Sequence, residues 1–361
     1  MSRILIAGGG TAGHVVPALA LADVLTARGH EVSFCGSGRG MEGDLVPRAG
    51  YPFSVVRIRG FSRKLGISTL RTLGSIPRAG YDAWSLLRRL RPDCVVGVGA
   101  YASGPVVAEA AFRHIGTLVV EMDSHMGWTN RILSHLVDRV CLSFPDAGRP
   151  EPKYVYTGRP LRPSLLEATR EQGIARFGLD PERPVLLVFG GSLGARTLNE
   201  VTLGAYAGTQ TSFQIIHVCG EREYERVSAA LRESDANRSY QAFPYLDDFP
   251  LALAVADAVV SRAGGSVAEI LARGVPALLV PWPLAAGDHQ TKNAAMVAAQ
   301  GAARVVADAN LTPEVLAREV DDLLDPTVNR GMRAAALALA RPDAATRIAD
   351  LIVELASPSK G

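Results

Sequence analysis

Short apolar runs alternate with helical patterns along almost the whole chain. Continuous apolar strands separated by helices of about 10–15 residues are typical of parallel sheets covered on both faces. The runs form two series. The first series is Ile4–Ala7, Glu31–Cys35, Cys94–Val98, Leu118–Glu121 and Arg139–Leu142. The second is Val185–Phe189, Gln214–Val218, Ala258–Ser261 and Ala277–Val280. Helical periodicity is plain at Val15–Arg28, Ser266–Ala272, Lys292–Gln300 and Pro313–Leu324.

A proline-rich stretch separates the two series. It contains Pro150-Glu151-Pro152 and the segment Gly158–Pro163. Such composition is typical of an interdomain linker. We therefore expect an N-terminal domain over residues 1–160 and a C-terminal domain over residues 161–341.

Each half opens with an apolar strand, a glycine-rich turn and a helix. The turns are Gly8–His14 and Gly190–Ala195. In doubly wound sheets, ligands bind outside the carboxyl ends of the strands, where such turns lie. The pattern predicts the α/β class, with two doubly wound, Rossmann-like parallel-sheet domains facing each other across a cleft.

The first turn matches the dinucleotide fingerprint at Gly8, Gly10 and Gly13. An NAD site also needs an acidic residue about 20 positions further on to hold the ribose. The second strand ends in Phe34-Cys35-Gly36-Ser37, without a carboxylate, which disfavours NAD. His14 stands at the start of the helix, and an imidazole titrates near neutrality, which suits proton transfer. A structural histidine that caps the turn is the alternative.

The second turn is a better phosphate site. The backbone amides of Gly190–Ala195 and the Ser192 hydroxyl would bind a diphosphate at a helix N-terminus. No Gly-Lys-Ser/Thr follows, so the turn is not a Walker loop and ATP hydrolysis is disfavoured.

A third glycine turn precedes a helix in the second half. Gly264, Gly265 and Ser266 form this turn, and Glu269 falls in the first turns of the helix. There a carboxylate can accept two hydrogen bonds from a ribose diol, although an ordinary helix N-terminal carboxylate is the alternative. The six polar residues 288–293 that follow a buried strand suggest a loop that reads sugar hydroxyls.

Composition adds limits to this picture. The 361 residues are 48% apolar and 20% charged, with a formal net charge of +2. These values indicate two globular domains, and the overall charge argues for no particular partner. The apolar run after Met1 breaks at Gly8, too early for a signal peptide, so we expect a cytoplasmic protein. The four cysteines are dispersed in apolar stretches and are expected to be buried. They are Cys35, Cys94, Cys141 and Cys219.

Metal sites fit the sequence poorly. The seven histidines are dispersed, and no two aspartates lie two apart. A departing diphosphate would then be met by amides, hydroxyls and helix dipoles. The sequence predicts neither a metal nor a cofactor.

Residues 57–91 are strongly basic. Apolar residues are interleaved with nine basic ones and one acid, Asp82. This composition suits anionic lipid headgroups, and a solvated basic face is the alternative. No recognised nucleic-acid module accompanies the charge, so no nucleic-acid partner is expected. The basic residues are Arg57, Arg59, Arg63, Lys64, Arg71, Arg78, Arg88, Arg89 and Arg91, and the apolar residues interleaved with them include Leu65, Ile67, Leu70, Leu73 and Ile76.

Five motifs in order across nearly the whole chain resemble the MurG family, the bacterial N-acetylglucosaminyltransferases that make lipid II. The motifs are Gly9-Gly10-Thr11-Ala12-Gly13-His14-Val15-Val16-Pro17-Ala18, Met41-Glu42-Gly43-Asp44-Leu45-Val46-Pro47, Gly99-Ala100-Tyr101-Ala102-Ser103-Gly104-Pro105, Gly190-Gly191-Ser192-Leu193-Gly194-Ala195-Arg196-Thr197-Leu198-Asn199 and Gly287-Asp288-His289-Gln290-Thr291-Lys292-Asn293-Ala294.

The resemblance implies a GT-B fold and inverting transfer of N-acetylglucosamine from UDP-N-acetylglucosamine. The acceptor would be the C4 hydroxyl of the muramoyl sugar of lipid I, an undecaprenyl-diphosphate-linked sugar. The protein would then lie peripherally on the cytoplasmic face of the membrane, with the first domain toward the acceptor and the second binding the donor. The last helix, 342–357, would pack back on the first domain.

The resemblance also implies roles for individual residues. His14 would be the general base. Thr11, Ala12 and Gly13 would line the cleft near the donor, Arg162 and Ser192 would approach its diphosphate, Leu246 the uracil, Glu269 the ribose and Gln290 the sugar hydroxyls. The remaining donor-side residues would be Asp123, Gly264, Gly265 and Ser266, and the acceptor-side residues Tyr101, Glu121 and Asn130.

Two departures from the family pattern leave alternatives open. Ala12 replaces a glycine that normally permits close backbone approach. The usual His-Glu-Gln-Asn segment appears as Val120-Glu121-Met122-Asp123, and a carboxylate replaces a carboxamide at Asp123. Glu121, Asp123 and His125 are therefore further candidates for the base. A related UDP-sugar transferase with another lipid or natural-product acceptor is the second interpretation, and a UDP-sugar epimerase is the third.

Overall fold

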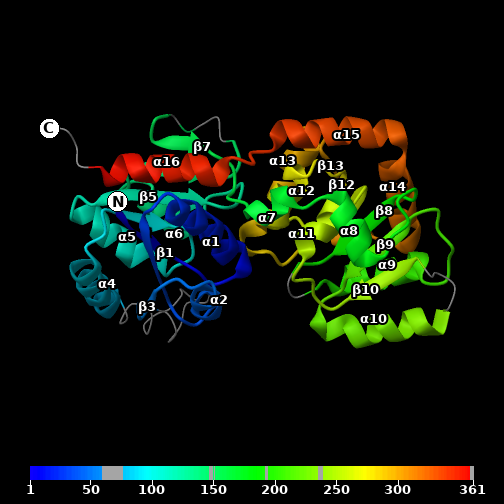
Figure 1. The fold of residues 1–361 in the computed structure, drawn as a ribbon, viewed down its shortest axis with the longest axis horizontal. Coiled ribbons are helices and arrows are strands. Elements are labelled where there is room, and N and C mark those ends of the chain that lie inside the picture. Colours follow the sequence, from blue (N-terminus) through cyan, green and yellow to red (C-terminus); the bar gives the residue numbers. More distant parts are fainter. Residues whose placement is uncertain (59–75, 146–148, 150, 192–193, 235–238, 358–361) are drawn as a thin grey trace. The chain divides into compact units, whose positions relative to one another are not determined.

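The computed structural model describes residues 1–361 except 59–75, 146–148, 150, 192–193, 235–238 and 358–361. The chain divides into two compact units. Unit 1 comprises Met1–Arg162 and Arg341–Gly361, and unit 2 comprises Pro163–Ala340. Each unit contains one parallel sheet with helices packed against it (Figure 1).

Unit 1 holds a seven-stranded sheet in the order β3-β2-β1-β4-β5-β6-β7. All its paired strands are parallel. The strands are β1 (Arg3–Ala7), β2 (Glu31–Gly36), β3 (Phe53–Val55), β4 (Cys94–Gly97), β5 (Gly116–Glu121), β6 (Arg139–Leu142) and β7 (Tyr154–Tyr156). The described helices are α1 (Ala12–Ala27), α2 (Glu42–Arg48), α4 (Ile76–Leu90), α5 (Ser103–Phe112), α6 (Trp128–Leu133) and α16 (Ala344–Ala356).

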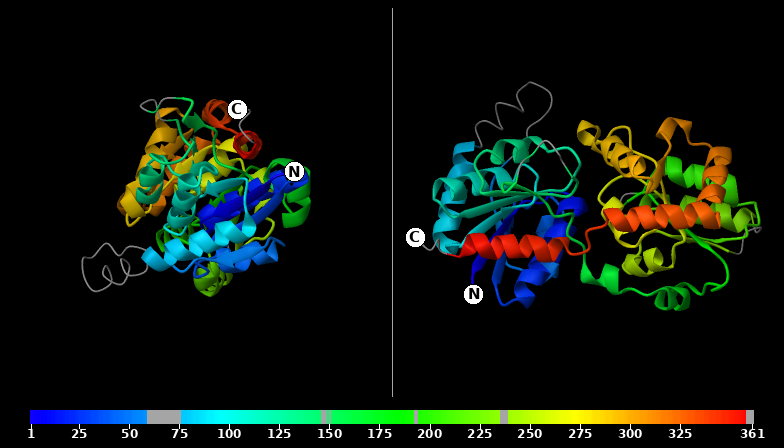
Figure 2. Two further views of the ribbon diagram at one scale, coloured as in Figure 1. Left: turned by 90° about the vertical axis from the view of Figure 1, so that its left-hand side faces the viewer. Right: turned by 90° about the horizontal axis from the view of Figure 1, so that it is seen from above.

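Alternation along the strands builds two cores in unit 1, one on each face of the sheet. Ile4 and Ile6 join the core beneath α1 and α16. Leu5 and Ala7 join the core beneath α4, α5 and α6. Both faces of a parallel sheet are buried in this way, which is why the strands read as continuous apolar runs. Helix α16, drawn in red, packs against strands β4 and β5 of this sheet (Figure 1 and the right-hand view of Figure 2).

Unit 2 holds a six-stranded parallel sheet in the order β10-β9-β8-β11-β12-β13. The strands are β8 (Val185–Phe189), β9 (Gln214–Val218), β10 (Tyr240–Phe243), β11 (Ala258–Ser261), β12 (Ala277–Leu279) and β13 (Ala303–Val305). The described helices are α7 (Pro163–Glu167), α8 (Arg170–Phe177), α9 (Arg196–Tyr206), α10 (Glu221–Ser234), α11 (Phe249–Val255), α12 (Ser266–Ala272), α13 (His289–Ala299), α14 (Pro313–Leu324) and α15 (Pro326–Leu339). Short 3-10 turns occupy Ala286–Asp288 and Asp308–Asn310.

All nine predicted strands are present, and four short strands were not predicted. The additional strands are β3, β7, β10 and β13. Strand β7 corrects the interpretation of residues 150–163 as a linker, because Tyr154–Tyr156 pairs with β6 as the edge of the first sheet. A three-residue edge strand buries little apolar surface, so neighbouring prolines dominated the sequence signal.

The predicted loop at 288–293 is also wrong, because α13 begins at His289. Its polar side chains obscured the helical period. Asn293 is buried inside the unit, where its Nδ2 donates to the carbonyl of Ala263 over 3.2 Å. A polar side chain can be buried in a protein core when it forms a hydrogen bond there, as Asn293 does.

The four cysteines are buried and unpaired, as predicted. Burial raises the pKa of Cys35 and of Cys141 to about 12. These thiols therefore behave as small apolar side chains.

Candidate functional site

In unit 1, β1 and β4 are neighbours in the sheet. From β1 the chain adds strands toward one edge as far as β3, and from β4 it adds them toward the other edge, so the strand order reverses between β1 and β4. The turns after these strands lie at the switch point, where open α/β sheets bind ligands. Gly8–Thr11 follow β1, and Val98–Ala102 follow β4.

His14 lies in the first turn of α1, at this switch point. Its Nδ1 is 3.2 Å from the hydroxyl oxygen of Thr11, the residue that precedes the helix. A Cβ atom on Gly99 would lie 2.8 Å from the Cδ2 atom of His14, and Gly99 has a φ of +92°. Only glycine fits both this conformation and this approach. The β4 turn is therefore shaped around the imidazole ring.

Glu42 supports the first glycine turn from within unit 1. Its side chain is 2% exposed. Its Oε2 accepts a hydrogen bond from the amide of Gly10 over 2.7 Å, and its Oε1 accepts one from the Ser37 hydroxyl over 2.8 Å. Burial raises the pKa of Glu42, but these hydrogen bonds outweigh it, so the pKa lies below the usual 4.5. The carboxylate is thus charged and fixes the turn.

Arg159 joins two loops of the unit 1 site. It is buried, and its guanidinium donates to the carbonyl of Gly13 and, over 3.0 Å, to the carbonyl of Met122. Gly13 precedes His14, and Met122 precedes Asp123. One cation therefore sets the position of the α1 turn relative to the β5–α6 loop.

Glu121 organises the β5–α6 loop. Its carboxylate accepts hydrogen bonds from the amides of Asp123 (3.1 Å) and Gly127 (3.0 Å). The Asn130 side-chain amide donates a third over 3.0 Å. Burial raises the pKa of Glu121 above 4.5, against the opposing effect of these donors. With both oxygens occupied, Glu121 holds the loop rather than presenting a free base.

The other candidates of unit 1 differ in exposure. Thr11 and His125 are exposed, whereas Ala12, Tyr101 and Asp123 are half-buried. Arg162 is exposed and is the last residue of the first segment of unit 1, before the chain enters unit 2.

In unit 2 the switch point lies between β8 and β11. The Gly190–Ala195 turn follows β8, and the turn with Gly264 and Gly265 follows β11. Two predicted sites therefore come to neighbouring strand ends. Ser192, the predicted diphosphate ligand, lies outside the described residues.

Helix α13 brings Gln290 to the β11 turn. Its Oε1 accepts a hydrogen bond from the Trp282 amide over 2.9 Å. Its Nε2 would lie 3.9 Å from a Cβ on Gly264. Glu269 lies in the first turn of α12 beside Ser266 and is half-buried. Leu246 is buried in the segment after β10.

Arg262 also stabilises the turn that follows β11, through contacts with residues distant in the sequence. It is 9% exposed and forms an ion pair with Asp308 at 2.5 Å. It donates to the Val280 carbonyl over 3.1 Å, at the end of β12. Arg262 precedes this turn in the sequence, but its partners Asp308 and Val280 are distant in the sequence and become apparent only in the fold.

Among the described residues, no group of three or more His, Cys, Asp or Glu side chains has an arrangement that could hold a metal ion.

Comparisons with known proteins agree with this arrangement. Residues 4–142 match the glycosyltransferase family 28 N-terminal domain, and residues 185–348 match the glycosyltransferase family 28 C-terminal domain. The UDP-N-acetylglucosamine--N-acetylmuramyl-(pentapeptide) pyrophosphoryl-undecaprenol N-acetylglucosamine transferase of Levilactobacillus brevis is 38% identical over 360 residues. That alignment covers 98% of this chain and 99% of the relative. The chain belongs to this transferase family.

Solved structures agree with the assignment of this chain to the transferase family. The crystal structure of Acinetobacter baumannii MurG is 31% identical and superposes with a TM-score of 0.80, covering 98% of this chain and 100% of that one. The chain thus has the GT-B fold. A UDP-GlcNAc 2-epimerase from Neisseria meningitidis, bound to UDP-GlcNAc, has a TM-score of 0.70, with coverage of 98% and 100%. At 13% identity, it shares the fold alone.

Proposed function

We propose that this enzyme transfers N-acetylglucosamine from UDP-N-acetylglucosamine to the lipid-linked muramoyl acceptor, lipid I, and so forms lipid II. The observation that carries the proposal is the full-length similarity to the Levilactobacillus brevis transferase, whose name states this donor and acceptor. The two glycine turns at the switch points support it, because a nucleotide-sugar transferase needs an anion site and an acceptor site.

In this proposal, unit 2 binds the donor. The amides of the Gly190–Ala195 turn and the N-terminus of α9 stabilise the diphosphate. Ser192 and Arg162 add to that site, Leu246 borders the uracil and Glu269 holds the ribose. Gly264, Gly265, Ser266 and Gln290 contact the sugar and its phosphates, and Thr11, Ala12, Gly13 and Asp123 complete the donor site. No metal or other cofactor takes part.

Unit 1 binds the acceptor and supplies the base, with Tyr101, Glu121 and Asn130 on the acceptor side. His14 takes the proton from the C4 hydroxyl of the muramoyl sugar as that oxygen attacks the anomeric carbon. The bond to the UDP oxygen breaks on the opposite face, so the configuration at the anomeric carbon inverts. The contact between Thr11 and Nδ1 of His14 supports this role, because it orients the ring.

Exposed aromatic side chains of unit 1 support peripheral attachment to the inner face of the cell membrane. Tyr81 and Trp84 stack at 6.0 Å on α4, and Arg88 and Arg113 lie 5.2 and 5.7 Å from the Trp84 ring. Trp128 is 80% exposed on α6. Exposed aromatics beside arginines suit a lipid–water interface. Of the basic residues between 57 and 91, Arg59, Arg63, Lys64 and Arg71 lie outside the described residues. None of the described helices is long and apolar enough to cross a membrane.

Labelled UDP-N-acetylglucosamine with a panel of lipid-linked acceptors tests the function. We expect UDP release and label transfer only with the diphosphate-linked muramoyl lipid. Preference for another acceptor would favour the related transferase suggested by the altered segment 120–127. Isomerised nucleotide sugar without acceptor would indicate an epimerase and overturn the proposal.

Replacing the base tests the mechanism. We expect His14→Ala to lower kcat by about 10²- to 10⁴-fold, the usual contribution of a general base, with little change in donor KM. Equal losses in donor affinity and kcat would contradict the role of His14.

A further inference from the structure

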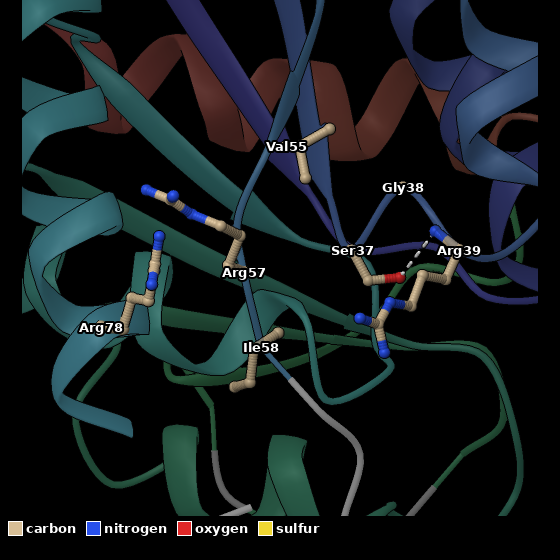
Figure 3. A pocket seen from close by; sticks show the side chains of 7 residues that line it. All are labelled: Ser37, Gly38, Arg39, Val55, Arg57, Ile58 and Arg78. Atoms are coloured by element: carbon tan, nitrogen blue, oxygen red, sulfur yellow. Dashed lines mark hydrogen bonds between the residues drawn. The ribbon is translucent and has the colours of Figure 1, made fainter. Parts of the chain in front are cut away.

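A basic pocket opens at the carboxyl ends of β2 and β3 in unit 1. The cavity has a volume of about 560 Å³. Ser37 and Arg39 follow β2, Arg57 and Ile58 follow β3, and Arg78 comes from α4. In the view of Figure 3, Arg57 and Arg78 lie on one side of the pocket and Arg39 on the other.

The pocket carries surplus positive charge. Arg57 is neutralised by Asp82, which accepts hydrogen bonds from its Nε at 2.9 Å and its Nη2 at 2.6 Å. This pair lowers the pKa of Asp82, so the aspartate is charged at neutral pH. Arg39 and Arg78 make no side-chain hydrogen bond or ion pair within the part of the chain that the structure describes. Three guanidinium groups against one carboxylate leave a charge of about +2 at the cavity.

Ser37 links the pocket to the candidate active site. The Ser37 hydroxyl donates to Glu42, and the same carboxylate accepts from the amide of Gly10. The pocket and the glycine turn that precedes His14 therefore share one buried support.

We propose that Arg39, Arg57 and Arg78 bind the diphosphate of the lipid-linked acceptor. The inference rests on the proposed function, in which unit 1 takes the acceptor. A diphosphate diester carries two negative charges, which match the surplus of the pocket. Guanidinium groups are suited to phosphate because they donate paired hydrogen bonds in a plane. Asp82 holds Arg57 in place, while Arg39 and Arg78 remain available to the ligand.

Steady-state kinetics of the full-length enzyme with a detergent-solubilised, short-chain diphosphate acceptor tests the pocket. We expect Arg39→Gln and Arg78→Gln each to raise acceptor KM about tenfold, the lower range for a hydrogen bond to a charged group. Donor KM and kcat should change little. The matched control is Arg48→Gln, an exposed arginine on α2, which should behave as the wild type.

A monophosphate-linked acceptor provides the second arm. The wild type should favour the diphosphate acceptor, and both pocket variants should lose most of this preference. Unchanged acceptor KM in both variants would overturn the proposal. So would unchanged KM together with weaker binding to phosphatidylglycerol-containing vesicles, which would assign the pocket to a membrane headgroup. Failure of the wild type to use any diphosphate acceptor would instead overturn the proposed function.

Discussion

At the scale of single residues, buried charged groups hold the loops of unit 1. Glu42 fixes the turn before α1 from a position 32 residues away along the chain. Arg159 bridges that turn to the loop that contains Asp123. A buried charge is costly without partners, and each of these two residues forms at least one hydrogen bond with a backbone group of the site. They act by positioning His14 and Asp123.

Two substitutions at Glu42 separate the hydrogen bonds from the charge. Glu42→Ala leaves the Gly10 amide without its carboxylate acceptor, and we expect a loss of about 1–3 kcal/mol in the free energy of unfolding. Turnover should fall with it, because the turn loosens. Glu42→Gln retains an oxygen for Gly10 and an N–H donor for Ser37, so activity should be largely restored. Urea unfolding and steady-state turnover measure both effects. A glutamine variant as impaired as the alanine variant would refute the hydrogen-bond role.

At the scale of elements, a buried polar network ties α9 to β9 and β10 in unit 2. Asn199 on α9 donates from Nδ2 to the Cys219 carbonyl over 2.9 Å, so its Oδ1 is left to accept from Nε2–H of His217 over 2.9 Å. Nδ1 of His217 then accepts from the Tyr240 hydroxyl over 2.7 Å. A Cβ on Gly194 would lie 2.3 Å from the same Cys219 oxygen. The network therefore anchors α9, the helix that follows the Gly190–Ala195 turn.

This network makes unit 2 sensitive to acid. Burial lowers the pKa of His217 from 6.5 to about 3. Between these values the unfolded chain binds the proton and the folded chain does not. The free energy of unfolding should therefore fall as pH falls from about 6.5 toward 3, by up to about 1.4 kcal/mol per pH unit from this group.

Urea unfolding between pH 8 and 4 measures the slope. His217→Gln should be less stable at pH 8, because a shorter side chain breaks the network, but its stability should depend less on pH. His135→Gln, at an exposed histidine of unit 1, is the control and should keep the wild-type slope. An unchanged slope in His217→Gln would show that His217 is not the acid-sensitive group.

At the scale of the whole molecule, the chain enters unit 2 after Arg162 and returns to unit 1 at Arg341. The returning helix, α16, contributes buried side chains to a hydrophobic core of unit 1. Ile348, Ala349 and Ile352 are fully buried beside α1 and the sheet. Gly116 of β5 is so close that an added Cβ would meet the Leu355 carbonyl at 2.4 Å. Unit 1 is therefore built from both ends of the described chain.

A cavity in α16 tests this dependence. Ile352→Ala should lower the stability of unit 1 by about 2–5 kcal/mol, the usual effect of emptying a buried isoleucine site. Hydrogen exchange should accelerate in β1, β4 and β5 and stay unchanged in β8 and β11. Glu354→Ala removes only an exposed ion pair with Arg139 at 3.4 Å, worth less than about 1 kcal/mol, and serves as the control. Equal acceleration in both sheets would contradict an independent core.

The sequence by itself determined the features that are local. Apolar runs predicted nine strands, because a strand buried on both faces needs no distant partner to be recognised. Glycines after the strands predicted the turns at both switch points, because a tight turn depends on the backbone conformations that its own residues can adopt. The five ordered motifs predicted the family.

Tertiary structure decided what depends on distant partners. Glu42, Arg159 and His217 owe their roles to backbone or side-chain groups that lie far away in the sequence. The polar start of α13 and the short strand β7 carried misleading local signals, because a buried partner for Asn293 and an edge beside β6 appear only when the sheets form. The basic pocket likewise exists only because β2, β3 and α4 bring three arginines together.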